Sequence, residues 1–171
     1  MATLTNFTQG TKAKSSEVNG NFTNVNDEVE LNNTKGNVFF VPSMAYSSII
    51  AGTWTFSVSG NDVVSTLNSV SSPADGDELN YTLFLRAGTY KLQVFGVGGT
   101  TTAIQDWYIG ASEVASFDWY TPSGTNFREQ TGITVSADAL YTIRAVLDGR
   151  NGSSSSWVSN WYYFILTRTG A

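Results

Sequence analysis

The chain has 171 residues, of which 41% are apolar and 13% aromatic, and this is enough for one sizeable hydrophobic core. It contains no cysteine and no histidine, which excludes thiol and imidazole catalysis and the usual zinc, copper or haem ligands, so no cofactor is expected. The net charge of −5 without a basic stripe argues against nucleic acid as a partner, and no apolar run approaches the roughly 18 residues that membrane insertion requires.

The first 36 residues predict an extended arm followed by a short helix. Residues 1–14 carry no sustained hydrophobic period, whereas residues 15–36 predict a short coiled coil because four apolar side chains recur at heptad spacing: Val18, Phe22, Val25 and Val29. The other helical positions are polar, so a single helix would bury almost nothing and would be marginal in water. The seam therefore needs partners, and its β-branched residues suit a parallel bundle of two or three copies of this chain.

From residue 37 the hydrophobic period changes to two, which predicts a mainly β head domain over residues 37–171. The expected strands are separated by turn residues and cover 38–41, 54–59, 63–70, 79–86, 90–97, 103–109, 114–120, 140–147 and 161–167. The turn Gly60-Asn61-Asp62 predicts a hairpin, and the segments 71–77, 121–132 and 148–156 are expected to be loops. Eight or nine short strands indicate an antiparallel β-sandwich, with a jelly roll as the expected topology.

The last expected strand is apolar on both faces. Its alternating positions are Trp161, Tyr163 and Ile165 on one side and Tyr162, Phe164 and Leu166 on the other. Either a loop covers the second face or a neighbouring subunit does, and both alternatives stay open. In the pairs Trp107-Tyr108 and Trp119-Tyr120, neighbouring rings point to opposite faces, so one member of each pair is expected in the core.

Two segments of the chain resemble tailed-phage proteins. The run from Gly10 to Phe22, GTKAKSSEVNGNF, is similar to the start of phage fibre and minor structural proteins, where such a segment leads into a trimeric coil. The strand and turn pattern from Tyr81 through Ala87-Gly88-Thr89-Tyr90 to the DGRNGSS run and Leu166-Thr167-Arg168 resembles the jelly-roll heads of phage fibres. Such heads are similar in shape to tumour-necrosis-factor-like and carbohydrate-binding sandwiches. The resemblance implies a homotrimer on the virion surface, on tail or capsid, attached to other virion proteins by its N-terminal arm.

The loop 148–156, DGRNGSSSS, is the richest hydrogen-bonding segment of the chain. Arg150, Asn151 and Ser153 can grip sugar hydroxyls, and Trp157 can provide the ring on which a sugar stacks. The alternative is a plain connecting loop with Trp157 tucked against the core.

The acidic residues do not form a recognisable site in the sequence. Asp75, Asp77 and Glu78 offer three oxygen ligands where Ca²⁺ needs six or more, so a solvated acidic turn is expected and no metal. No spacing selects a catalytic pair for glycoside cleavage among the remaining carboxylates, which include Asp106, Glu113, Asp118, Glu129, Asp138 and Asp148.

The sequence therefore predicts a non-enzymatic virion fibre protein whose head adheres to host-surface glycan. One alternative is a capsid head fibre or decoration protein with a structural or weakly adhesive role. A second alternative, a free carbohydrate-binding module, differs from both because it predicts a monomer.

Overall fold

The computed structural model describes residues 38–57, 66–69, 73–121 and 124–170. The chain divides between Asn37 and Val38 into two units, and the described residues all belong to the second. The predicted arm (1–14) and coiled coil (15–36) lie outside the described residues. The oligomer seam remains a prediction for the same reason, since it consists of Val18, Phe22, Val25 and Val29.

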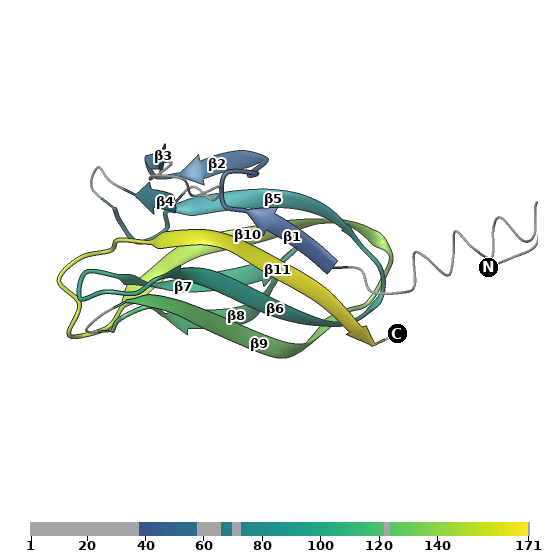
Figure 1. Cartoon of the computed structure of the whole chain (residues 1–171). Helices are drawn as coiled ribbons and strands as arrows, with labels where there is room; N and C mark the ends of the chain where they lie inside the picture. Colours follow the sequence, from purple (N-terminus) through teal and green to yellow (C-terminus); the bar gives the residue numbers. More distant parts are fainter. Residues whose placement is uncertain (1–37, 58–65, 70–72, 122–123, 171) are drawn as a thin grey trace, which may run out of the picture. The chain divides into compact units, whose positions relative to one another are not determined.

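The described residues form two antiparallel sheets, which confirms the predicted mainly β sandwich (Figure 1). Sheet A contains β1 (Val38–Pro42), β3 (Trp54–Ser57), β4 (Thr66–Ser69), β6 (Gly88–Val97), β9 (Thr125–Val135) and β11 (Asn160–Gly170). Sheet B contains β2 (Ser48–Ala51), β5 (Glu78–Leu85), β7 (Ala103–Ile109), β8 (Ser112–Asp118) and β10 (Ala139–Arg150). Within the described part of the chain, no helix is long and apolar enough to cross a membrane.

The strand order places β11 at the centre of sheet A. The order is β3-β4-β11-β6-β9, with β1 also paired to β11, and sheet B runs β2-β5-β10-β7-β8. From β5 onward the chain passes to the other sheet at every connection except the β7–β8 hairpin. At the first of these crossings stands Gly88 with φ +149°, where a side chain would collide with the backbone oxygen of Gly170. The turn therefore requires glycine because β6 and β11 approach closely there.

The core between the sheets is built around four aromatic side chains. Trp107 and Tyr81 come from sheet B, and both meet Trp161 and Phe164 of β11. The ring centroids of Trp107 lie 5.2 Å from Trp161 and 5.0 Å from Phe164, with interplanar angles of 79° and 63°. These edge-to-face pairs tie one sheet to the other, each adding about 0.5–1.5 kcal/mol beyond the burial of its area.

A bulge in β11 changes which of its side chains point into the core. The register against β6 shifts between Trp161 and Tyr163, so Trp161, Phe164 and Leu166 all point into the core. Strict alternation from Trp161 was therefore the wrong expectation, since a bulge moves a side chain to the other face. Tyr163 and Ile165 remain on the outer face of sheet A, half-buried.

Two strands were not predicted. The segment 121–132 was expected to be a loop, but β9 begins at Thr125 and continues to Val135. It is an edge strand paired only with β6, and its polar run Arg128-Glu129-Gln130-Thr131 hides the alternation because an edge strand needs little apolar cover. The edge strand β2 was also missed, because its four residues, Ser48 to Ala51, are too few to show an alternation. The predicted pairing of the two strands of the hairpin is confirmed, since β3 is antiparallel to β4. The predicted turn Gly60-Asn61-Asp62 lies outside the described residues.

We expect Phe164→Ala to lower the free energy of unfolding by about 3–5 kcal/mol, because this fully buried ring contacts three other core rings. Phe84→Ala is the matched control, since Phe84 is exposed on sheet B and its loss should cost under about 1 kcal/mol. Urea denaturation of both variants measures the difference. Equal losses would contradict the assignment of the core.

Candidate functional site

Four parts of the chain next to strand ends meet at one end of the sandwich: residues 73–77, 98–102, 119–121 with 124, and 148–159. The backbone N–H of Gly149 donates to the Asp75 carboxylate at 3.0 Å, which joins the first of these segments to the last. Val158 N–H donates to the Thr101 carbonyl at 2.9 Å, and Gly98 N–H donates to the carbonyl of Gly124 at 3.0 Å. The fold therefore brings together most of the segments that the sequence predicted as loops.

The predicted loop 148–156 begins three residues later than expected, because β10 extends through Arg150. Asn151 holds this loop against the end of β8. Its side-chain amide donates to a carboxylate oxygen of Asp118 at 2.7 Å, while its own oxygen accepts the N–H of Ser153 at 2.9 Å. The second carboxylate oxygen of Asp118 accepts the backbone N–H of Tyr120 at 2.8 Å. Because both ends of the Asn151 amide are engaged, we infer that this predicted ligand-binding residue orders the loop.

The serines that follow fix the rest of the loop. The buried hydroxyl of Ser154 lies 2.8 Å from the carbonyl oxygen of Thr102 and 2.9 Å from that of Ser156, and its single proton is shared between these two acceptors. The backbone N–H of Ser155 donates to the Thr100 carbonyl at 3.0 Å. A loop fixed by its own hydrogen bonds loses little further conformational entropy when it binds a ligand.

Among the predicted ligand-binding residues, Arg150 provides a cation and Trp157 provides an aromatic ring. The guanidinium carbon of Arg150 lies 5.8 Å from the centroid of the Trp157 ring. Arg150 is exposed, whereas Trp157 is half-buried with part of its ring packed against the core, so both readings of Trp157 hold in part. Ser153, the remaining predicted residue, is exposed beside them in the sequence. Together they present a cation, part of an indole and a hydroxyl to solvent.

Arg128 belongs to this end of the molecule and sequence reasoning missed it. Its guanidinium donates through Nε and Nη2 to the Asp118 carbonyl at 3.1 and 2.9 Å. The same guanidinium lies 5.3 Å from the ring centroid of Trp119, which is buried. Its role depends on two residues of another strand, so no local pattern in the sequence signals it.

Two of the three residues of the acidic turn are buried, contrary to expectation, whereas Asp75 is exposed. Asp77 is buried, and its carboxylate accepts the backbone N–H of Ala74 at 3.1 Å. Glu78 forms a bidentate pair with Arg144, both contacts being 2.8 Å, and this hydrogen bonding raises the pKa of Arg144. Among the described residues, no three acidic side chains are arranged to hold a metal ion.

Three of the candidate carboxylates gather on the outer face of sheet B: Asp106, Glu113 and Asp148. Burial raises the pKa of Asp106, and the neighbouring charges of Glu113 and Asp148 raise it further, while a hydrogen bond from Ser116 opposes the change. A hydrogen bond between Asp106 and Asp148 also favours the protonated form.

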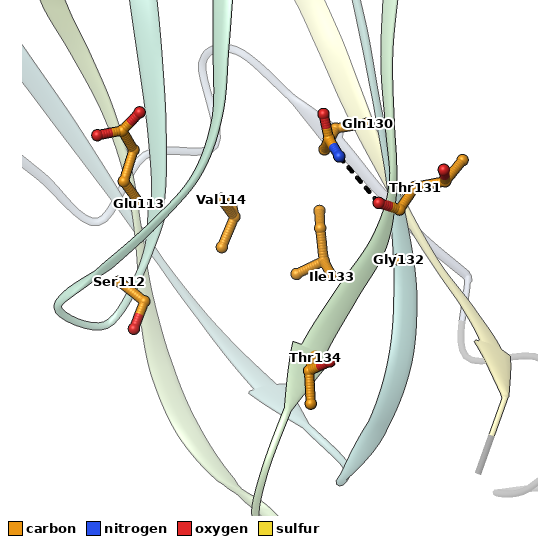
Figure 2. A pocket seen from close by; sticks show the side chains of 8 residues that line it. All are labelled: Ser112, Glu113, Val114, Gln130, Thr131, Gly132, Ile133 and Thr134. Atoms are coloured by element: carbon orange, nitrogen blue, oxygen red, sulfur yellow. Dashed lines mark hydrogen bonds between the residues drawn. The ribbon is translucent and has the colours of Figure 1, made fainter.

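A separate cleft of about 260 Å³ lies between the edge strands β8 and β9. Figure 2 shows Val114 and Ile133 on opposite walls, facing the space between the strands. The remaining lining is mostly polar and comprises Ser112, Glu113, Gln130, Thr131, Gly132 and Thr134. No aromatic side chain lines this cleft among the described residues, so it offers hydrogen bonds without a ring for a sugar to stack on.

We expect Asn151→Ala to loosen the loop 148–156 and to lower the free energy of unfolding by about 1 kcal/mol, because Asp118 loses its amide donor. Backbone hydrogen exchange measures the effect, and the Ser153 N–H should exchange faster. Ser153→Ala is the control, since it leaves the Asn151 hydrogen bonds in place. Unchanged exchange in Asn151→Ala would show that the loop does not depend on this residue.

The raised pKa of Asp106 predicts a pH dependence of stability. Folding favours the protonated carboxyl, so this contribution is complete below the ordinary value of 3.8 and is lost as pH rises through the folded-state pKa. Asp106→Asn is neutral at every pH and lacks this loss. We expect the stability of the variant relative to the native chain to increase from acidic to neutral pH in thermal unfolding. A difference that stays constant with pH would contradict the raised pKa.

No family model and no curated protein sequence matches this chain. The fold, however, is similar to that of several solved β-sandwiches. The CBM36-1 domain of a multidomain xylanase from the hindgut metagenome of Trinervitermes trinervoides has a TM-score of 0.61 and 18% identity, covering 79% of this chain and 100% of that domain. A carbohydrate-binding module, CBM36, in complex with calcium and xylotriose has a TM-score of 0.56 and 18% identity, covering 75% of this chain and 98% of that one.

An enzyme of known structure shares the fold over a small part of its length. A Paenibacillus xanthan lyase matches with a TM-score of 0.59 and 22% identity, covering 76% of this chain and 13% of the lyase. At these identities the similarity concerns the fold alone. The head of this chain thus has a β-sandwich like that of carbohydrate-binding modules.

Proposed function

We propose that the head binds glycan, without cleaving it, through the loop end that carries Arg150 and Trp157. The observation that carries this proposal is the guanidinium of Arg150, at the end of β10, lying 5.8 Å from the Trp157 ring, next to a loop ordered by its own hydrogen bonds. Sugars need an apolar ring against their C–H face and fixed polar groups for their hydroxyls. Arg150 and Ser153 are exposed and supply such polar groups.

The fold supports the same conclusion. A module with this fold was solved with xylotriose bound, so the scaffold is compatible with presenting a sugar-binding surface. Fold alone does not determine function, and the argument for this chain therefore depends on its own loop residues.

The contacts of the acidic side chains next to the loop end support binding without catalysis. Glu78 is paired with Arg144, and both carboxylate oxygens of Asp118 accept hydrogen bonds from the loop end. The chemistry that remains at the loop end is recognition.

We extend the proposal to the kind of particle that carries the head. We propose a homotrimeric fibre on the surface of a phage, on tail or capsid, with residues 1–14 attached to other virion proteins and the head turned outward. The support is the fibre-like run from Gly10 to Phe22 and the heptad seam that follows it. A capsid decoration protein fits the same features. A free carbohydrate-binding module is the competing reading, and a single-chain mass in light scattering would favour it.

We expect the labelled full-length chain to bind a subset of a glycan array, and Trp157→Ala to weaken that binding at least tenfold, about 1.4 kcal/mol. Arg150→Ala should weaken it as well, because the guanidinium is exposed beside the ring. Glu113→Gln, in the cleft between β8 and β9, is the matched control and should bind normally. An array with no bound glycan would refute the proposal. If only Glu113→Gln lost glycan binding, the binding site would be the cleft between β8 and β9.

A further inference from the structure

A row of four aromatic rings crosses the outer face of sheet A. Phe40 of β1, Tyr163 of β11, Phe95 of β6 and Phe127 of β9 follow one another with ring centroids 4.7, 4.6 and 5.1 Å apart. Tyr163 is the backbone partner of Phe95, and Phe95 is the partner of Phe127, so the row runs directly across neighbouring strands. These strands lie side by side in Figure 1. None of these rings is part of the buried core.

The row is unusually exposed for such large apolar side chains. Phe40 is 54% exposed and Phe127 is 44% exposed, and Val38 on β1 is exposed beside them. Ile165, the backbone partner of Phe40, is half-buried on the same face. A contiguous apolar surface of this kind in a soluble domain marks a contact with another molecule.

The geometry of the rings favours a protein over a sugar as that molecule. The rings of Tyr163 and Phe95 are stacked with an interplanar angle of 28°, and their neighbours are tilted by 39° and 44°. Rings that turn their faces toward each other leave mainly edges for solvent. A sugar stacks on ring faces, whereas the apolar side chains of a protein pack equally well against edges.

The charges on the outer face of sheet A indicate which protein can pack against the aromatic row. The charged side chains identified on this face are Lys91 and Glu129, which pair at 3.5 Å, and Gln93 donates to the same carboxylate at 2.7 Å. The face is thus locally neutral although the chain carries −5. Two copies of an acidic chain repel least where both are neutral. The outer face of sheet B is the opposite case, because Arg144 is outnumbered there by Glu78, Asp106, Glu113 and Asp148.

We propose that the aromatic row is the surface through which the head contacts a second copy of this chain. The N-terminal segment supports this choice of partner: residues 1–37 carry the predicted heptad seam and join directly onto Val38, the first residue of the strand that bears Phe40. Copies gathered by that seam are covalently linked to β1, so they bring this strand of each head to a high local concentration. This inference depends on the homotrimer proposed above. It adds the outer face of sheet A to the predicted seam as a second contact surface between copies.

The test uses the full-length chain with the seam broken by Val25→Asp, so that any association left comes from the head. We expect this chain to self-associate in light scattering across a range of concentrations. Adding Phe40→Ser and Phe127→Ser should weaken that association at least tenfold. The matched control adds Phe84→Ser and Leu140→Ser, which remove two exposed apolar side chains from sheet B and should leave the association unchanged.

Three results would overturn the inference. The first is a Val25→Asp chain that is monomeric at every concentration, and the second is equal dissociation in the sheet B control. The third is a Phe40→Ser, Phe127→Ser chain that keeps its mass but loses glycan binding, which would make the row a sugar site. Glycan binding by the Trp157→Ala chain is measured separately, so failure of the loop-end proposal and failure of this one give different results.

Discussion

The edge-to-face packing of Trp107 and Tyr81 against Trp161 and Phe164 is the contact on which the rest of the head depends. It joins the two sheets at β11, the strand that also pairs with β1, β4 and β6. Because those rings fix β11 from the core side, its outer side chains stand in a defined row, and its first residues fix where the loop 148–159 must end. Both proposed surfaces therefore depend on the position of one strand.

The sequence was informative where a side chain's surroundings are local and uninformative where they are remote. The expectation that one member of each pair Trp107-Tyr108 and Trp119-Tyr120 lies in the core is confirmed, because neighbouring side chains of an extended segment point to opposite faces. The structure shows that the buried member is the tryptophan in both pairs. Asn151 was expected to bind a ligand, yet its partner Asp118 lies 33 residues away and only the fold brings the two together. The bulge at Tyr162 and the edge strand β9 escaped prediction because both depend on register against β6.

The two proposed surfaces differ in the kind of order they use. The loop end is held by hydrogen bonds between polar groups, such as those of Asn151 and Ser154, and leaves Arg150 exposed. The outer face of sheet A is held by ring contacts and a neutral ion pair between Lys91 and Glu129. Polar groups fixed in advance suit a ligand rich in hydroxyls, and a neutral apolar row suits another protein surface. One fold can thus carry adhesion and assembly without competition between them.

The pairing of β1 with β11 also has a consequence for biosynthesis. Val38 pairs with Thr167, so the first and last strands of the described chain are neighbours in sheet A. During translation, β1, β4 and β6 leave the ribosome before the strand that joins them exists, and their unpaired edges stay exposed until β11 emerges. Contacts of such long sequence separation also form slowly. A growing chain of this design benefits from chaperones, and nascent copies held side by side risk exchanging their β11 strands.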